Sequence, residues 1–259
     1  CNNLTKVTMP STKSMDFIDC SIRSKVIVKN AAFDDITKVK FEPPTVKDSL
    51  PAELTAEPQS ETATASELVP YESNTLTLSS PADFKKIKEN LEKFKEVRKV
   101  VFGESIKYIP SDIFSEFENL ESIQGDEVVA IENNAFKSLY HLKTVIFPKV
   151  EIIGESAFED CRSLEAIELP NAKLIGAAAF ADCRWLVTIR LPEAITIERV
   201  AFTGCERLVT IEIPKATTIE RFAFMKCERL EAIEIPKITS IKENVFWNCR
   251  GLKTIKIPK

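Results

Sequence analysis

From Ile109 onwards, the apolar residues of the chain recur with a fixed 22-residue period. Each repeat carries a phenylalanine with an isoleucine five residues before it, a leucine six residues after it, and an isoleucine or valine nine residues after it. A fixed period of this length indicates a stack of supersecondary units, each too short to bury its own apolar face. The phenylalanines stand at Phe114, Phe136, Phe158, Phe180, Phe202, Phe224 and Phe246.

Each repeat divides into a strand segment and a returning segment. The strand segment, Leu-x-x-Ile-x-Leu/Ile-Pro, alternates between apolar and polar residues as a half-buried strand does, and proline fits a strand end because it cannot donate to a ladder. The returning segment, Ile-x-x-x-Ala-Phe-x-x-Cys, has apolar residues spaced for a helical or 3₁₀ turn. When the repeats stack in register, equivalent positions are expected to form columns about 4.8 Å apart along a parallel sheet.

The combined pattern, seen clearly over 153–170, resembles the leucine-rich repeat of the BspA-like subclass, also called the Treponema pallidum type. The resemblance covers about 98–259, where seven or more positions recur in register. It implies an α/β solenoid with 22-residue repeats and a parallel sheet on its concave face. It also implies a protein of a bacterial or protist cell surface that serves as an adhesion or protein-binding module.

Residues 75–97 are predicted to form an N-terminal cap on the repeats. Ser80-Pro81-Ala-Asp83 is a strong helix start, with serine at the N-cap, proline at N1 and an acidic residue at N3. A helix over 81–96 would present an amphipathic face, and the open end of a solenoid needs such a cover. The apolar residues at helical spacing are Phe84, Ile87, Leu91, Phe94 and Val97.

The solenoid is predicted to span 98–259, with its first strand at Lys99–Phe102. Val101 lies one full repeat period before Ile123 and would therefore take the central buried position. In this register Arg98 falls where the repeat has leucine, so the first unit is expected to be degenerate.

The N-terminal third of the chain does not follow the 22-residue pattern. Residues 1–41 contain two short strand-like segments and are expected to form a small β element. Residues 42–74 are expected to be an extended or disordered linker, since 42–70 is rich in proline and acidic residues and holds no aromatic side chain.

Cys1 is followed by a polar stretch, as the first residue of a processed bacterial lipoprotein would be. This pattern predicts a lipid on Cys1, with an arbitrary boundary of the sequence as the alternative. At the other end, Lys259 directly follows a repeat's proline, so either further repeats or a partner is expected to cover the last one.

Composition narrows the function classes. The 259 residues carry a net charge of −4 and 44% hydrophobic residues, and this weak acidity gives no electrostatic basis for nucleic-acid binding. No apolar run reaches the roughly 18 residues of a membrane span, so membrane contact is expected only through a lipid at Cys1. His141 is the only histidine, and the sequence has no Gly-rich phosphate loop and no Cys-x-x-Cys. We therefore expect neither an enzyme nor a cofactor.

A cysteine recurs in five successive repeats. The equivalent residues of the two earlier repeats are Phe117 and Leu139, so the position belongs to the core, where a free thiol packs as a small apolar group. Disulfides and a metal site are weaker alternatives, because one column offers neither opposed side chains nor convergent ligands. The column comprises Cys161, Cys183, Cys205, Cys227 and Cys249.

Two surfaces could bind a partner. On the concave sheet, the residues that flank each central isoleucine point outward, and a partner is predicted to bind at Glu168, Thr188, Arg190, Thr210, Glu212 and Glu234. The alternative is an apolar patch at turn positions that elsewhere hold mostly small or polar residues, formed by Phe222, Met225 and Trp247, with Trp185 isolated in another column. Either set could instead be a solvated face or local packing.

The resemblance thus predicts a non-catalytic binding or adhesion module whose partner is a protein or other macromolecule of the cell surface or host matrix. The expected location is a bacterial cell surface or outer membrane, as a lipoprotein, or the secreted fraction. A structural spacer without a dedicated ligand is the alternative, and an enzyme is a remote one.

Overall fold

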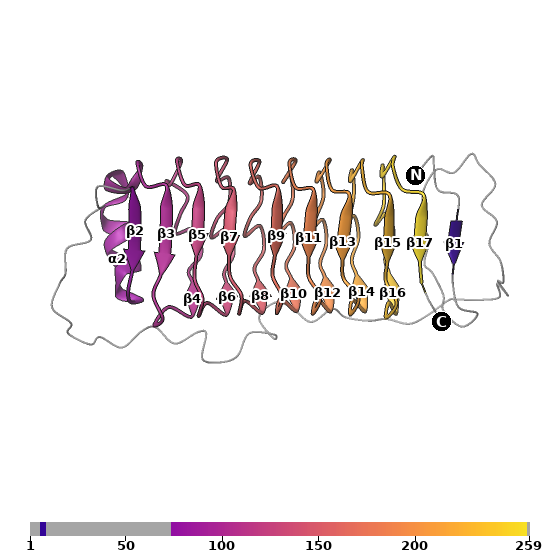
Figure 1. The fold of residues 1–259 in the computed structure, drawn as a ribbon, viewed down its shortest axis with the longest axis horizontal. Coiled ribbons are helices and arrows are strands. Elements are labelled where there is room, and N and C mark those ends of the chain that lie inside the picture. Colours follow the sequence, from indigo (N-terminus) through magenta and orange to yellow (C-terminus); the bar gives the residue numbers. More distant parts are fainter. Residues whose placement is uncertain (1–5, 9–73, 258–259) are drawn as a thin grey trace. The chain divides into compact units, whose positions relative to one another are not determined.

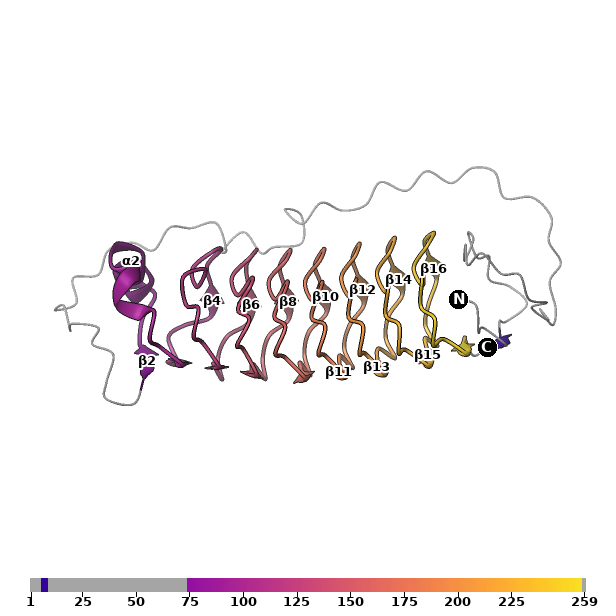
Figure 2. The ribbon, with the colours of Figure 1, turned by 90° about the horizontal axis from the view of Figure 1, so that it is seen from above.

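The computed structural model describes residues 6–8 and 74–257. In the described part that begins at residue 74, the chain winds into stacked turns, and equivalent strands of successive turns lie side by side (Figure 1, Figure 2). One row consists of β2 (Thr75–Leu78), β3 (Lys99–Phe102) and the three-residue strands β5 (Ser122–Gln124), β7 (Thr144–Ile146), β9 (Ala166–Glu168), β11 (Thr188–Arg190), β13 (Thr210–Glu212), β15 (Ala232–Glu234) and β17 (Thr254–Lys256).

A second row of two-residue strands runs along the other side of each turn. All pairings in both rows are parallel; in the first row, for example, Ile189 lies between Ile167 and Ile211. The fold is therefore a parallel β-solenoid. The second row consists of β4 (Tyr108–Ile109), β6 (Ala130–Ile131), β8 (Ile152–Ile153), β10 (Leu174–Ile175), β12 (Thr196–Ile197), β14 (Thr218–Ile219) and β16 (Ser240–Ile241).

The returning segment of each repeat is not helical, so the predicted α/β class is corrected. Among the described residues, one α-helix is found, and it precedes the repeats. Six successive repeats each place two residues, four apart, in the left-handed region, as at Ser156 (φ 55°) and Asp160 (φ 63°). Because a right-handed helix cannot pass through such residues, the segment forms turns instead.

Stacked phenylalanines form the centre of the core. The rings of Phe158, Phe180 and Phe202 are fully buried, nearly parallel, and have centroids 5.2 and 5.5 Å apart. Each ring is covered on both faces by the equivalent ring of the neighbouring turns. Core stability is therefore shared between turns rather than contained within one.

The repeated cysteines lie beside this stack as free, fully buried thiols, as predicted. Each Sγ donates a hydrogen bond to the carbonyl oxygen of the phenylalanine 25 residues earlier, as Cys205 does to Phe180 at 3.1 Å. Burial raises the pKa of the Cys205 thiol well above its usual value. These thiols are therefore core groups with a satisfied donor.

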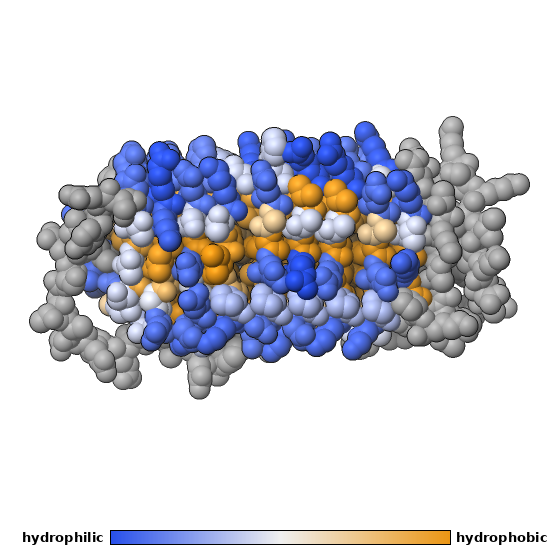
Figure 3. All heavy atoms as spheres, viewed as in Figure 1, coloured by the Kyte–Doolittle hydropathy of each residue, from blue (hydrophilic) through white to orange (hydrophobic). Residues whose placement is uncertain are grey.

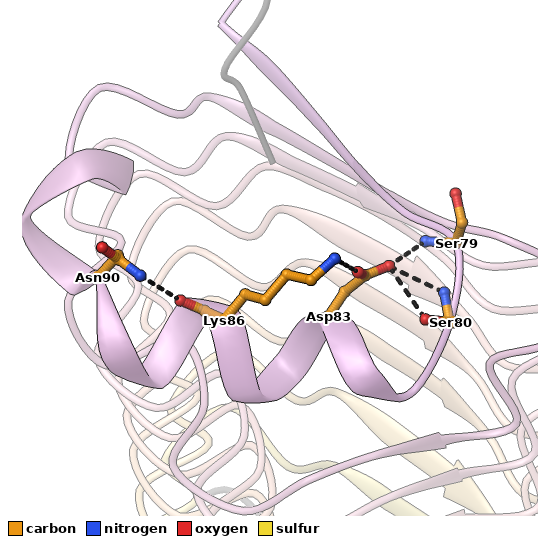
Figure 4. A network of polar contacts seen from close by, with 5 residues as sticks. All are labelled: Ser79, Ser80, Asp83, Lys86 and Asn90. Atoms are coloured by element: carbon orange, nitrogen blue, oxygen red, sulfur yellow. Dashed lines mark hydrogen bonds and ion pairs between the residues drawn. The ribbon is translucent and has the colours of Figure 1, made fainter. Parts of the chain in front are cut away.

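The helix before the repeats is shorter than the predicted 81–96. It comprises α2 (Ala82–Glu89) and, after a break at Asn90 (φ −141°), the 3₁₀ turn η2 (Leu91–Phe94). The Asn90 side-chain amide donates to the carbonyl oxygen of Lys86, which ends the α-helical segment (Figure 4). Phe84 and Ile87 are buried in the same core as the repeats, whereas the capping role of 75–97 stays a prediction.

The helix start also differs in detail from the predicted one. The Ser80 hydroxyl does not accept from a helix N–H; it donates to the Asp83 carboxylate at 3.4 Å. Asp83 Oδ2 in turn accepts from the backbone N–H groups of Ser79 and Ser80 (Figure 4). Half of the expected capping box is therefore present, and the acidic residue supplies it.

The register of the first strand corrects the prediction by one residue. Val100, not Val101, pairs with Ile123 and is fully buried, and Val97 fills the position that leucine occupies in later repeats. The first repeat is thus longer than the later ones by a single residue. Since a shift of one residue exchanges the two faces of a strand, Arg98 is left exposed, where it pairs with Glu121.

The predicted β element at 1–41 and linker at 42–74 lie outside the described residues, apart from 6–8 and Asn74. Strand β1 (Lys6–Thr8) pairs in parallel with β17. Within the described ranges, no helix has the length and apolarity that a membrane crossing requires.

Candidate functional site

The three-residue strands present one continuous outward face. Each buries its central residue, and β7 to β15 expose the two flanking ones, as Ile189 lies between exposed Thr188 and Arg190. Figure 3, which shows this face, has rows of hydrophilic residues crossing the turns with apolar surface visible between them. The residues predicted for partner binding therefore lie on a single surface, set by the alternation of the strand segment.

Charged residues in the column that passes through Arg190 form a chain of ion pairs. Arg190 Nη1 lies 2.6 Å from Glu168 Oε1, and its Nε lies 2.7 Å from Glu212 Oε2. The hydrogen bond from Arg190 lowers the pKa of Glu212, and the same bond raises the pKa of Arg190. Further along, Lys256 lies 3.6 Å from Glu234. Exposed pairs of this kind add little stability.

Thr188 and Thr210 pair in register on neighbouring strands beside this chain. Their side chains are small and exposed. They lie between the column of Arg190 and the residues that immediately precede the strands. Five of the predicted binding residues, Glu168, Thr188, Arg190, Thr210 and Glu212, thus lie together on β9, β11 and β13, whereas Glu234 lies on β15.

The residues that immediately precede the strands form a second charged column, and it is interrupted at two turns. Lys143 lies 3.0 Å from Glu121, and Lys253 lies 3.3 Å from Glu231. Between these pairs the column holds Val187 and Val209. The carboxylate of Glu165, next to Val187, has no ion-pair partner among the residues that the structure describes.

Trp185 lies beside this interruption and is 51% exposed. The Arg207 guanidinium covers its ring at 4.1 Å from the side of the next turn. On the side of the previous turn is a shallow hollow of about 410 Å³, lined by Lys143, Ser163, Glu165 and Trp185. Sequence reasoning treated Trp185 as isolated; comparing each column along the repeats would have found the two valines in an otherwise charged column.

The alternative apolar patch lies in the turns that follow the two-residue strands. Phe222 and Met225 are partly buried, and Trp247 is 46% exposed. Phe222 has φ 59°, a strained conformation for a bulky residue, and Val200, one turn earlier, has φ 52°. The patch therefore combines an exposed aromatic ring with an unfavourable local backbone.

The described residues offer little for other chemistry. Nowhere in 6–8 or 74–257 do three or more histidine, cysteine or acidic side chains gather as metal ligands would. His141 is exposed, and Cys1, the predicted lipid site, lies outside the described residues.

Comparison with known proteins agrees with this geometry. The family model for the BspA type leucine rich repeat region matches residues 71–183 and 151–259, in six copies. A leucine-rich repeat protein of T. pallidum is similar at 30% identity and a TM-score of 0.51, over 53% of this chain and 66% of that protein. A comparison with curated proteins finds no match.

Two other solved structures are similar at lower scores. A leucine-rich repeat protein from Bacteroides ovatus is 24% identical, with a TM-score of 0.44 over 62% of this chain and 55% of that one. A leucine rich cell surface protein from Faecalibacterium prausnitzii is also 24% identical, with a TM-score of 0.36 over 65% and 62%. The chain thus spans under two thirds of the length of these two proteins. The family match alone covers more than half of the chain, which therefore belongs to the BspA-type leucine-rich repeat family.

Proposed function

We propose that this chain is a non-catalytic protein-binding or adhesion module and that its partner binds the outward face of β9, β11 and β13. This is the face that the resemblance makes the concave side of the solenoid. The observation that carries the proposal is the interruption of a charged column by Val187 and Val209 beside exposed Trp185. Exposed aromatic and aliphatic side chains bordered by fixed charges are typical of interface centres and their rims.

The predicted residues contribute in two ways. Thr188 and Thr210 are small and let a partner's backbone approach the strands closely. Glu168, Arg190 and Glu212 hold one another in place and together carry a single net negative charge, so they would orient a partner and favour basic groups. Leucine-rich repeat solenoids are typically interaction modules without catalysis, which agrees with this assignment.

A pull-down from cell-surface and host-matrix extracts tests the proposal when wild type is compared with two variants. Glu212→Lys with Glu234→Lys reverses charge on β13 of the proposed face and on the next strand of the row, β15. Its matched control changes the alternative patch to its column neighbours, Phe222→Ser, Met225→Thr and Trp247→Lys. We expect the first variant to lose the recovered partner or bind it with weaker salt dependence, and the control to retain it.

Other outcomes would count against the proposal. Loss of binding only in the control variant would assign recognition to the alternative patch, which the strained backbone of Phe222 and the exposure of Trp247 favour as a second candidate. Recovery of no specific partner would favour a structural spacer.

We infer that the protein acts at a bacterial cell surface or is secreted, on the strength of the family. Attachment through a lipid on Cys1 is the form of anchoring that the sequence predicts. Metabolic labelling with a radioactive fatty acid tests it: label that is lost in Cys1→Ser supports a lipoprotein, and an unlabelled wild type contradicts one.

A further inference from the structure

The interrupted column suggests what kind of partner the face accepts. In the column that holds Glu121, Lys143 and Glu165, opposite charges alternate until Val187 replaces the expected basic residue. Glu165 is thereby left exposed, without the cation that its place in the ladder would give it. A surface that lacks one basic member of a charge ladder is complementary to a partner that supplies a basic group at that place.

The apolar groups lie next to this carboxylate. Val187 is 36% exposed, Val209 is partly buried, and Trp185 forms one wall of the 410 Å³ hollow whose other lining residues include Glu165. The positive charges nearby are already engaged, because Lys143 pairs with Glu121 and Arg207 stacks on Trp185. Lys143 also lines the hollow, but it is paired with Glu121, so Glu165 is the acidic group of the lining that is left for an incoming cation.

We propose that this hollow binds a protein segment in which an apolar side chain stands next to a lysine or arginine. The apolar side chain would lie against Trp185 and Val187, and the basic group would pair with Glu165. The inference rests on the proposed function, and it adds the chemistry of the partner and the anchoring residues. An aromatic anchor with a matching charge at its rim is the arrangement in which a few residues carry most of the binding energy.

Selection from a phage-displayed library of random twelve-residue peptides on the purified chain tests this proposal. We expect enriched peptides that share an apolar residue beside lysine or arginine. Trp185→Ser introduces the residue that its column carries one turn earlier, Ser163, and Val187→Lys introduces the residue that its column carries two turns earlier, Lys143, so the fold should tolerate the change. This variant should weaken binding of the selected peptides about thirtyfold, as loss of a hot-spot residue does.

Two controls keep the outcome clear. Glu165→Gln should reduce the preference for basic peptides without removing apolar ones, and the alternative-patch variant at Phe222, Met225 and Trp247 should bind as wild type does. The proposal is overturned by absence of enrichment, by enriched peptides without a basic residue, or by binding that survives Trp185→Ser with Val187→Lys. If the selected peptides lose binding only to the variant at Glu212 and Glu234, this inference is wrong, whereas the proposed binding face is supported.

A separate observation concerns the N-terminal end. Strand β1 pairs with β17 in the register Lys6–Thr254, Val7–Ile255 and Thr8–Lys256. The sequence around β1 independently matches the repeat in that register. Cys1, Leu4, Val7, Met9 and Pro10 correspond in spacing and type to Cys249, Leu252, Ile255, Ile257 and Pro258.

From this agreement we infer that residues 1–10 have the sequence of the strand half of another leucine-rich repeat, and that the edge of β17 is a binding surface for β1 of the same chain. An unpaired strand edge accepts a further strand through backbone hydrogen bonds, and the alternating apolar positions supply specificity. In this correspondence Cys1 matches the buried cysteine column. The motif thus offers an explanation of Cys1 that competes with lipid attachment.

Hydrogen exchange of the full chain tests the strand pairing. The amides of β1 should exchange more than about tenfold more slowly than unstructured ones, and Val7→Asp should abolish this protection and also expose the amides of β17. Thr8→Asp, which pairs with exposed Lys256, is the matched control and should keep protection. Exchange of β1 at the unstructured rate in wild type would overturn the inference. A dimer in sedimentation analysis of the same sample would contradict pairing of β1 with β17 within one chain, since a second copy would then supply the strand.

Discussion

At the residue scale, the cysteine column illustrates how an equivalent position in several repeats decides the role of a side chain. The sequence predicted buried thiols because Phe117 and Leu139 occupy the same position earlier in the chain. It could not predict their hydrogen bonds to phenylalanine carbonyl oxygens, which depend on the pitch of the turns. These bonds change the expected effect of mutation.

Cys205→Ser should cost about 1 kcal/mol of unfolding free energy, because the buried hydroxyl can donate to the Phe180 carbonyl as the thiol does. Cys205→Val keeps the volume but leaves no donor and should cost a similar amount or less. Urea unfolding of both variants measures the difference. A loss above about 3 kcal/mol for Cys205→Ser would mean that the hydroxyl is unsatisfied and would contradict the assigned hydrogen bond.

Native cysteine reactivity gives a further expectation at this scale. Burial raises the pKa of Cys161 and Cys205, so their thiolates are rare at neutral pH. The five repeat thiols should therefore react with a maleimide reagent only after unfolding. Rapid reaction of any of them in the folded protein, followed by peptide mass mapping, would show that the column is accessible.

At the scale of elements, the repeat was predictable because its period leaves one consistent register. The first repeat did not follow this argument. Counting back 22 residues from Ile123 gives Val101, but this repeat has one additional residue, so Val100 takes the buried position. The early end of α2 was also missed, because the apolar residues from Phe84 to Val97 continue at helical spacing past Asn90. The turns that replace the expected helical segment were not predicted, since bulky Val200 and Phe222 are residue types that rarely adopt the left-handed conformation found there.

Asp83 makes the start of α2 sensitive to acid. Its pKa is raised by burial, but the hydrogen bonds from Lys86, Ser80 and Ser79 outweigh this and lower it overall. A carboxyl with a lower pKa in the folded state stabilises the fold above its unfolded pKa of about 3.9, and this contribution is lost as pH falls through the folded value.

Asp83→Asn keeps an acceptor oxygen but removes the negative charge at the helix N-terminus, so it should lower stability by about 0.5–1 kcal/mol at pH 7. The difference from wild type should shrink as the pH falls below about 4. Urea midpoints of both proteins across this range measure it. A difference that is the same at neutral and acidic pH would show that the charge of Asp83 is not what stabilises the helix start.

At the scale of the whole molecule, the sequence predicts the family and the stack of turns, because both follow from the repeat. The site is only partly predictable: alternation places Thr188 and Arg190 outward, but the ion pairs around Arg190 and the hollow beside Trp185 arise from contacts between turns. A periodic sequence makes every turn look alike, so a functional surface is found where neighbouring turns differ. Trp185, Val187 and Val209 mark such a place.

Hydrogen exchange with and without a captured partner or selected peptide tests the account most directly, because it locates the contact on the folded chain. The account predicts that bound ligand slows exchange in segments that cover 163–168, 185–190 and 207–212, while segments around Phe222 and Trp247 are unchanged. Protection confined to those turns, or to helix α2, would contradict recognition through the face of β9, β11 and β13.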